Sequence, residues 1–491
     1  MHFLSRREFL QDSTALAAAL AGSGLAGKTL AAAKKAKKGD ANDTLHVAII
    51  GVHGQGMTHV RALTGKHNCV VTTICDADEA VVGTAMKHVE KVQGKAPKYE
   101  QDLRRVMDDK SIDIISTATP NHWHALIAIW GMQSGKDVYV EKPVSHNVSE
   151  GRRMVEASER YNRLCQTGTQ SRSSLREAMD FLHSGKLGKV KLARGLCYKL
   201  RPSIGKVKGP QAIPSTVDYN LWTGPAPIKP LMRQRLHYDW HWIWDYGNGD
   251  LGNQGIHEMD KARWGLGKNE LAQSVISIGG RFGYVDDGET ANTQICVFDF
   301  GDCELIFEVR GLVSRNPFPG DDFQKVPKKP QNFVGNIWYA TDGVLVSGHG
   351  ATVALDHRGN VIQKFGGGED HFGNFVKAVR SRNRADLNAD ILEGHLSSAL
   401  CHLGNVSYRL GMLQPFSKES KAFGDDKDAY ETLARTAEHL KENGVPLDTT
   451  SYRVGRRLRV DAKTETFIED AEANRYLTRD YRKPFVVPQK I

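Results

Sequence analysis

Residues 45–56 of this 491-residue sequence read Leu45-His46-Val47-Ala48-Ile49-Ile50-Gly51-Val52-His53-Gly54-Gln55-Gly56, and they determine the fold class. The apolar first half is typical of a strand buried on both faces of a parallel sheet. Glycines directly after such a strand allow a tight turn and a close approach to a pyrophosphate at the start of the next helix. The stretch therefore predicts a dinucleotide-binding turn, which departs from GxGxxG only where His53 replaces the middle glycine.

The alternation of strands and helices continues beyond this turn. A second predicted strand, over 70–75, ends at Asp76. A carboxylate at this position accepts hydrogen bonds from the adenosine ribose hydroxyls, which favours NAD over NADP. Further strands are predicted over 112–117, 137–140 and 164–167, with helices over 102–109, 121–134 and 149–162, the last capped by Ser149. The pattern predicts an α/β fold with a Rossmann-type, doubly wound parallel sheet over residues 45–170.

Ligands bind such sheets at the carboxyl ends of the strands. The glycine turn, residues 117–124 and Glu141-Lys142-Pro143 all follow strand ends, so we expect them to line one crevice. The predicted cofactor contacts are Gly51, His53, Gly54, Gln55, Gly56, Asp76, Thr117, Thr119, Asn121, His124, Glu141 and Lys142.

Two residues are candidates for proton transfer. Lys142 can hold a substrate hydroxyl, or protonate a carbonyl if burial lowers its pKa, although a lysine before a proline is also typical of a surface turn. His257 has a pKa suited to accepting a hydroxyl proton near neutrality. It lies in a helix predicted from about 252 to 265, on a face with Asn253, Asp260 and Trp264 that is too polar for an ordinary core stripe.

The segment 237–246 is rich in aromatic and histidine side chains. Aromatic faces stack on sugar rings, so Tyr238, Trp240 and His241 are predicted to contact substrate. Two alternatives stay open here: a packed interface between domains, and a metal held by His237 and His241, for which no third ligand is evident.

Composition excludes several function classes. Hydrophobic residues make up 40% of the chain and charged residues 25%, as in ordinary globular proteins. The seven cysteines never form a CxxC pair, which argues against a disulfide framework or zinc module. More than half of the net charge of +9 lies in residues 1–38. The small remaining charge is spread over the rest of the chain, so the sequence shows no basic stripe that would bind nucleic acid.

The amino-terminal segment has the three parts of an export signal. Ser5-Arg6-Arg7-Glu8-Phe9-Leu10 precedes a modestly apolar stretch and Ala31-Ala32-Ala33. Paired arginines before Phe-Leu resemble a twin-arginine signal, whose route exports folded proteins, whereas the apolar part is too short and glycine-broken for a membrane span. We predict a signal peptide over 1–33, a linker over 34–44 and a periplasmic or otherwise exported protein. A disordered basic tail is the alternative.

Taken together, the glycine turn, Thr119-Pro120-Asn121-His122-Trp123-His124, Glu141-Lys142-Pro143 and Gly252-Asn253-Gln254-Gly255-Ile256-His257-Glu258-Met259-Asp260 resemble the Gfo/Idh/MocA oxidoreductases. The subgroup that the chain resembles is the exported bacterial type with twin-arginine signals. The resemblance, from about residue 45 to 415, implies an α+β domain over 171–415 with a large, mostly antiparallel sheet used for dimer or tetramer contacts. Strands are predicted over 274–278, 293–300, 304–310, 344–347, 352–355 and 361–365. Residues 416–491 form a carboxy-terminal extension.

The resemblance also implies site residues and a role in carbohydrate metabolism. Lys142, His257 and Asn253 are the expected catalytic residues, with proton transfer assigned to Lys142 and His257. Asn253 occupies a position that is Asp in members with the dehydrogenase motif, and an amide cannot accept a proton as a carboxylate does. The expected substrate contacts are Arg172, Tyr238, Trp240, His241, Asn253, His257 and Asp260.

Three functions follow from these residues. The first is an NAD(P)-dependent oxidoreductase that transfers hydride from a sugar, polyol or glycoside hydroxyl to a tightly bound nicotinamide cofactor. NAD is the expected cofactor and NADP the less favoured alternative. The second is a glycosidase that uses NAD in a transient oxidation. The third is a non-catalytic, nucleotide-bound sugar-binding protein. Retention of Glu141-Lys142-Pro143 favours the first.

Overall fold

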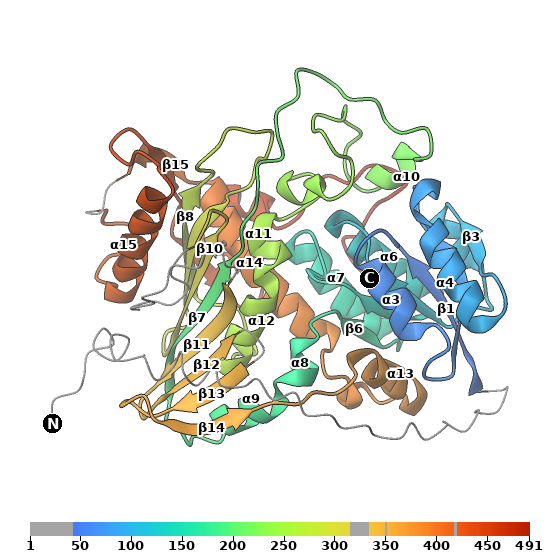
Figure 1. The fold of residues 1–491 in the computed structure, drawn as a ribbon, viewed down its shortest axis with the longest axis horizontal. Helices are drawn as coiled ribbons and strands as arrows, with labels where there is room; N and C mark the ends of the chain where they lie inside the picture. Colours follow the sequence, from blue (N-terminus) through green and yellow to red (C-terminus); the bar gives the residue numbers. More distant parts are fainter. Residues whose placement is uncertain (1–42, 315–332, 349–350, 417–419) are drawn as a thin grey trace.

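A parallel sheet and a mostly antiparallel sheet lie side by side in the computed structural model, at the right and left of Figure 1. The structure describes residues 43–314, 333–348, 351–416 and 420–491. The predicted signal peptide and nearly all of the predicted linker lie outside these ranges. No helix within them combines the length and the apolar character needed to cross a bilayer.

The parallel sheet has the strand order β3-β2-β1-β4-β5-β6. Its six strands in the described chain are β1 (Leu45–Ile50), β2 (Cys69–Cys75), β3 (Lys98–Glu100), β4 (Ile114–Thr117), β5 (Asp137–Val140) and β6 (Cys165–Thr167). The helices of this domain are α3 (Gly56–Leu63), α4 (Gly83–Gln93), α5 (Leu103–Asp108), α6 (Asn121–Gln133) and α7 (Val148–Arg160). The predicted Rossmann-type fold is confirmed.

Three local differences from the sequence expectation have physical reasons. The short strand β3 and the helix α4 were not predicted, because β3 is only three residues long and α4 carries mostly polar side chains. Helix α7 begins at Val148, so Ser149 is not its cap. The Asn147 side chain caps it instead, by accepting a 3.0 Å hydrogen bond from the Glu150 backbone N–H.

The second sheet has the order β14-β13-β12-β11-β7-β10-β9-β8-β16-β15, and among the described residues its neighbouring strands are antiparallel except β7 with β10. Its strands are β7 (Val190–Tyr198), β8 (Ser274–Gly280), β9 (Thr293–Asp299), β10 (Glu304–Arg310), β11 (Phe333–Ala340), β12 (Val344–Gly348), β13 (Ala351–Leu355), β14 (Val361–Phe365), β15 (Met412–Pro415) and β16 (Ser451–Val454). At one edge β17 (Leu458–Asp461) pairs with β8 and with β18 (Thr466–Phe467). The central strand β7 was not predicted, since Arg194 and Gly195 interrupt its apolar pattern.

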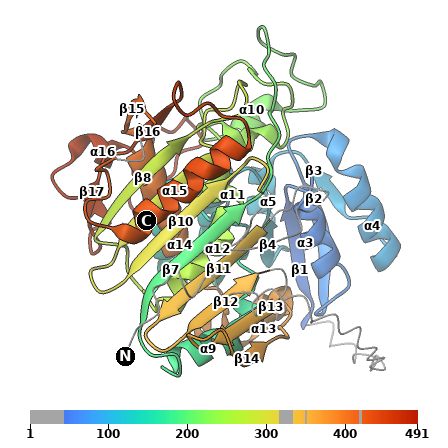
Figure 2. The same ribbon diagram turned by 60° about the vertical axis from the view of Figure 1, so that its left-hand side comes forward.

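Helices separate the two sheets and cover the outer face of the second. Between the sheets lie α12 (Gly255–Gly265) and α14 (Ile391–Arg409) (Figure 1). Helix α14 is buried along nearly its whole length. The outer face packs against α15 (Lys427–Glu442), which crosses it obliquely in Figure 2. The remaining helices are α8 (Ser171–Ser174), α9 (Arg176–His183), α10 (Tyr219–Thr223), α11 (Gly249–Asn253), α13 (His371–Ser381) and α16 (Ala471–Arg475).

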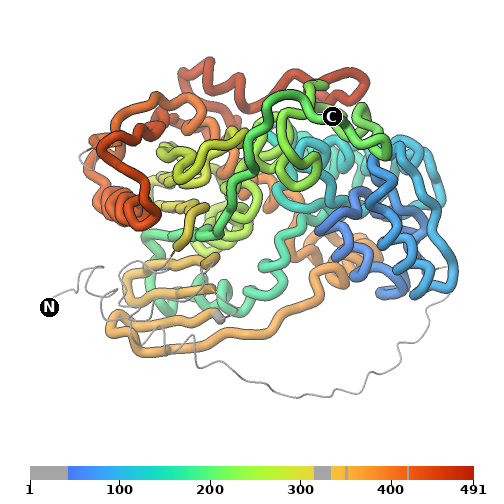
Figure 3. The backbone as a smooth tube through the Cα atoms, turned by 45° about the horizontal axis from the view of Figure 1, so that its top comes forward, coloured from blue at the N-terminus to red at the C-terminus, as the bar shows by residue number. Residues whose placement is uncertain are grey.

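The carboxy-terminal extension connects both domains. After α15 and β16 it returns to the nucleotide domain, as the red end of the tube in Figure 3 shows. There Phe485 is fully buried, with its ring centroid 5.3 Å from that of Trp123. Arg160 Nη1 donates a 2.6 Å hydrogen bond to the backbone oxygen of Ile491. The last residues therefore hold the nucleotide domain against the sheet domain.

Candidate functional site

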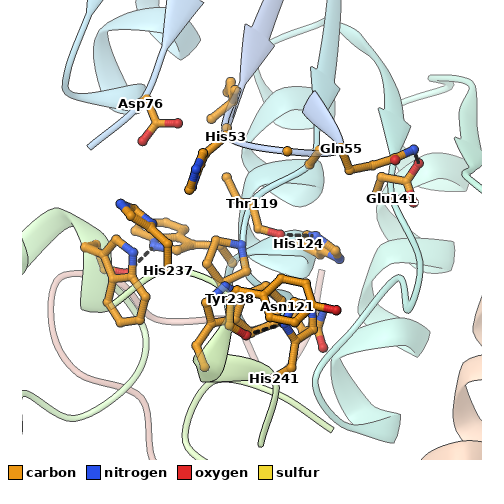
Figure 4. A pocket seen from close by; sticks show the side chains of 18 of the residues that line it. His53, Gln55, Asp76, Thr119, Asn121, His124, Glu141, His237, Tyr238 and His241 are labelled. Carbon is orange, nitrogen blue, oxygen red and sulfur yellow. Dashed lines mark hydrogen bonds between the residues drawn. The ribbon is translucent and has the colours of Figure 1, made fainter. Parts of the chain in front are cut away.

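A cleft of about 670 Å³ lies between the carboxyl ends of the Rossmann strands and residues 199–257 of the second domain. Figure 4 shows the side chains that face each other across it. It is lined by every predicted site residue except Gly56, Thr117, Arg172 and Asp260.

The glycine turn shows why three of its positions carry no side chain. Gly51 has φ 81°, and a Cβ there would lie 2.9 Å from the Thr119 backbone nitrogen. A Cβ on Gly56 would lie 1.9 Å from the Gly51 oxygen, so Gly56 packs beneath the turn and not in the cleft. Gly54 has φ 78° and faces open space, with nothing within 4 Å of its Cβ position. Its exposed backbone suits a phosphate group.

His53 occupies the position of the missing middle glycine without closing the turn. Its side chain is exposed at the rim, and its ring centroid is 4.6 Å from that of His237 across the cleft (Figure 4). Next to it, Asp76 Oδ2 accepts a 2.9 Å hydrogen bond from the Val52 N–H. Burial raises the pKa of the Asp76 carboxyl group. The carboxylate is thus fixed at the end of β2, where a ribose hydroxyl can reach it.

Lys142 projects from the end of β5 toward the second domain. Its Nζ donates a 2.7 Å hydrogen bond to the backbone oxygen of Asn253. Burial lowers the pKa of the Lys142 ammonium, and the nearby Glu141 opposes this shift. Asn253 therefore contributes its main-chain carbonyl to the lysine, a contact that the identity of its side chain does not reveal.

Glu141 organises the floor of the cleft. Its carboxylate accepts hydrogen bonds from Gln55 Nε2 at 3.1 Å, His59 Nε2 at 3.2 Å and Gln170 Nε2 at 3.2 Å. Burial raises the pKa of Glu141, but the hydrogen bond and charge of His59 outweigh it and lower the pKa to about 2. His59 and Gln170 were not predicted as site residues, and only the apolar spacing of α3 could have placed His59 on the buried side of that helix.

His257 lines the cleft from the first turn of α12. The predicted continuous helix over 252–265 is wrong, because α11 ends at Asn253 and α12 begins at Gly255. The interruption frees the Asn253 carbonyl for Lys142. Burial, reinforced by the Lys142 charge, lowers the pKa of His257 well below 6.5, so its imidazole is neutral at neutral pH.

Arg172 and Asp260 do not reach the cleft, which corrects their predicted contact with substrate. Arg172 Nε and Nη2 donate to the Asp260 carboxylate at 2.9 Å and 2.8 Å, and both side chains are buried. Ser397 Oγ donates to the same carboxylate at 2.7 Å. The polarity of Asp260 reflects a buried ion pair between α8 and α12. Thr117 is likewise buried, at the end of β4.

The aromatic segment forms the opposite wall. Tyr238, at φ 66°, precedes the 3₁₀ turn η3 (Asp239–Trp242) and accepts a 2.8 Å hydrogen bond from Arg201 Nη1. His237 Nε2 lies 2.8 Å from Asp78 Oδ2, and His241 Nδ1 lies 2.5 Å from the backbone oxygen of Tyr238. The two histidines thus have separate partners, and no group of three metal-binding side chains occurs in the part of the chain that the structure describes.

Three further polar groups complete the wall and floor: Asn121 and His124, which were predicted, and Lys199, which was not. Lys199 follows β7 and donates a 2.8 Å hydrogen bond from Nζ to Gln254 Oε1. Asn121 Oδ1 is buried and has no hydrogen-bond partner among the described residues. His124 contacts the backbone oxygens of Pro143 and Thr119, at 2.6 Å and 2.8 Å, and so joins two of the segments that follow strand ends.

Two family models match the chain. Residues 45–169 match "Oxidoreductase family, NAD-binding Rossmann fold", and residues 181–312 match "Oxidoreductase family, C-terminal alpha/beta domain". These are the GFO_IDH_MocA models for the two domains.

Curated relatives match a shorter region. A glycosyl hydrolase family 109 protein of Shewanella sp. (strain W3-18-1) is 32% identical over 179 residues, or 34% of this chain and 39% of the relative. An alpha-N-acetylgalactosaminidase of Shewanella oneidensis is 29% identical over the same shares. The chain therefore spans about two fifths of the length of these relatives.

A solved structure extends the similarity to the fold as a whole. The WlbA dehydrogenase from Bordetella pertussis, in complex with NADH and UDP-GlcNAcA, has a TM-score of 0.54 and 17% identity. The similarity covers 74% of this chain and 97% of that one. The two-domain arrangement of the described residues is thus shared with a solved structure.

Proposed function

We propose, from the premise that this chain belongs to the Gfo/Idh/MocA oxidoreductase family, that it oxidises a hydroxyl of a sugar, polyol or glycoside with a tightly bound NAD. The observation that carries the proposal is the meeting of Lys142 and His257 in one cleft with the glycine turn. The lysine comes from a Rossmann strand end and the histidine from the sheet domain. Fold similarity alone would not supply this pair of proton-transferring groups.

The residues of the cleft fit a dinucleotide. Gly54 leaves its backbone open to a pyrophosphate, Gly51 allows the turn that precedes it, and Asp76 is placed for the adenosine ribose. The unpartnered Asn121 Oδ1 offers an acceptor near Thr119 and His124, where the nicotinamide half would lie. When bound, NAD supplies the acceptor for the hydride.

The chain's own residues handle the proton. In the described structure no hydrogen bond engages the imidazole of His257, so a ring nitrogen is available for the proton of the substrate hydroxyl. Lys142, anchored by the Asn253 oxygen, presents its ammonium hydrogens to the same substrate oxygen. Its charge stabilises the developing alkoxide as the carbon–hydrogen bond breaks. Asn253 itself does not act as a base in this scheme.

A contact between the domains supports retention of the cofactor. Residues 77–79, after β2, meet residues 216–218 and His237 of the second domain; we call this contact the clasp. Asp218 N–H donates to the Ala77 oxygen at 2.9 Å, and Glu79 N–H donates to the Thr216 oxygen at 3.1 Å. The His237–Asp78 hydrogen bond closes the same corner at 2.8 Å. The clasp lies beside Asp76, at the end of the cleft where adenosine would bind, so these contacts would slow the release of a nucleotide.

A glycosidase that oxidises its sugar transiently is the second candidate. The glycosidase names of the curated relatives favour it, although their match is confined to 179 residues. Both candidates use the same first hydride transfer, so Lys142 and His257 serve either. They differ in the product: a dehydrogenase accumulates oxidised sugar, whereas the glycosidase returns the hydride and releases the aglycone.

Native mass spectrometry of the purified protein, followed by a panel of sugars and nitrophenyl glycosides, tests the proposal. We expect bound NAD, and a change in nicotinamide absorbance with at least one sugar. Nitrophenol release without net reduction of the cofactor would instead support the glycosidase. Bound NAD without turnover of any substrate would support a non-catalytic sugar-binding protein, and absence of nucleotide would refute cofactor retention.

We further propose that the protein is exported by the twin-arginine route, as in the exported subgroup of the family, and that it forms a homo-oligomer. The support is the Ser5–Leu10 pattern and the family resemblance. Export of a folded protein suits a retained cofactor, because the nucleotide can be loaded before transit. Cell fractionation of an R6K/R7K variant should trap the protein in the cytoplasm, and light scattering should report a dimer or tetramer; an unchanged location or a monomer would contradict the respective proposal.

A further inference from the structure

A second hollow, of about 260 Å³, shares no lining residue with the cofactor cleft. It lies among the end of α14, the helix α16 and residues 244–248, and three arginines line it: Arg409, Arg475 and Arg479. All three lie outside the residues that the family models match. We refer to it as the arginine hollow.

Arg409 is exposed and lies over two aromatic rings, with no charged partner among the residues that the structure describes. Its guanidinium carbon lies 4.8 Å from the ring centroid of Trp244 and 4.6 Å from that of Tyr476. Such contacts orient the planar guanidinium and leave its N–H groups free to donate. Neither Arg409 nor Arg475 forms an ion pair or a side-chain hydrogen bond with another residue in the ranges that the structure describes.

The neighbouring carboxylates already have partners. Asp245, which lines the hollow, has Oδ2 2.6 Å from Lys229 Nζ and Oδ1 4.0 Å from Arg479 Nη2, and Glu289 Oε2 accepts the Trp244 N–H at 2.7 Å. Glu150 accepts the His146 N–H at 2.7 Å and the Tyr481 hydroxyl at 3.0 Å. The arginine hollow is therefore positively charged, because its cations outnumber the acids that could balance them.

Neutral groups in the wall also lack partners. Arg479 Nη1 can only donate, so its 3.3 Å contact with His146 Nδ1 places the imidazole hydrogen on Nε2. This Nε2 is buried and has no acceptor among the described residues. Asn248 Oδ1 is also buried without a donor, on a residue that is 5% exposed. Buried polar groups without partners are costly, and a ligand with both oxyanion and hydroxyl groups would satisfy them.

We propose that the arginine hollow binds a small oxyanion, a phosphate or carboxylate, either free or carried on a molecule about the size of one sugar unit. Its volume lies below the ~300–1,000 Å³ of typical ligand cavities, which excludes a dinucleotide. Arginine forks match the two-oxygen edge of such anions. The site is separate from hydride transfer and does not depend on the proposed activity.

Isothermal titration of the full-length protein with inorganic phosphate, glucuronate and glucose tests the proposal and identifies the source of the anion. We expect phosphate or glucuronate to bind and glucose not to bind. Tighter binding of glucuronate than of phosphate would indicate a sugar acid, and the reverse a free or phosphorylated anion. The absence of binding by both anions would overturn the proposal.

Variants locate the site. R409M/R475M should raise the Kd of the bound anion at least tenfold, whereas R358M, a change at an exposed arginine outside the hollow, should leave it unchanged. Equal NAD content in the wild type, R409M/R475M and R358M would show that the cofactor cleft is intact. An anion affinity of R409M/R475M equal to that of the wild type would refute the assignment. If that variant does not fold, wild-type crystals soaked in selenate should show an anomalous peak within hydrogen-bonding distance of Arg409, and a peak only elsewhere would be equally decisive.

Discussion

Removal of the His237 side chain should release the cofactor faster, because His237 closes the clasp at the adenosine end of the cleft. The imidazole Nε2 lies 2.8 Å from Asp78 Oδ2, and the two side chains are 26% and 6% exposed. The histidine belongs to the second domain and the aspartate to the nucleotide domain. H237A therefore breaks a contact between domains and removes the ring contact with His53, but it leaves the glycines of the turn and Lys142 unchanged.

The magnitude follows from this geometry. A hydrogen bond to a charged group contributes about 1.5–3 kcal/mol, and the partial exposure of His237 places this one near the lower end. About 1.4 kcal/mol corresponds to a factor of ten. The two backbone contacts of the clasp, at 2.9 Å and 3.1 Å, remain in the variant, so the cleft is loosened and not opened. We expect the dissociation rate of NAD to rise about tenfold.

The assay is the time course of NAD release from loaded, purified protein after dilution and filtration. H183A is the matched control, because His183 makes a single 2.8 Å hydrogen bond to the Trp264 oxygen away from the cleft. D78N and the H237A/D78N double variant complete a double-mutant cycle, in which the double variant should release NAD little faster than H237A alone. A release rate for H237A equal to that of wild type, or matched by H183A, would refute the clasp as the basis of retention.

Three further predictions concern chemistry and cofactor binding. K142M and H257N should each lower kcat/KM by at least about 10²-fold while NAD content is unchanged, because each removes a proton-handling group; full activity of either would contradict its assignment. The kcat of the wild type should rise with pH below 6.5 as His257, whose pKa burial lowers, loses its proton. It should fall again below pH 10.5 as Lys142, whose pKa burial also lowers, loses its own; a kcat that falls as the pH rises toward 6.5 would contradict the role of His257, and one that does not fall by pH 10.5 would contradict that of Lys142. Gly54 and Gly94 have φ 78° and 73° with open space at their Cβ positions, so G54A and G94A should each lower the free energy of unfolding by about 1–2 kcal/mol. Only G54A should lose NAD, and equal NAD content in the two variants would show that Gly54 does not face the pyrophosphate.

Much of the nucleotide domain was predictable from local sequence. The run from Leu45 to Ile50 confines its residues to a buried strand, and the glycines after it allow positive φ at Gly51 and Gly54. Asp76 directly follows the next strand. Lys142 at a strand end and His257 on a polar helix face could be proposed for the same reason, because periodicity and turn chemistry are encoded within a few neighbouring residues.

Only the tertiary structure decided which of these side chains meet. Asp260 shares the polar helix with His257, yet it points to Arg172 and leaves the cleft. Asn253 matters through its backbone oxygen, which Lys142 reaches from a separate domain. The clasp joins Asp78 to His237, and the arginine hollow joins residue 146 to residue 479, because burial and charge pairing select partners far apart in the chain. Sequence determined the local conformations and the chemical inventory of this protein, whereas long-range packing determined which groups form its sites, since local periodicity carries no information on the partner across a domain interface.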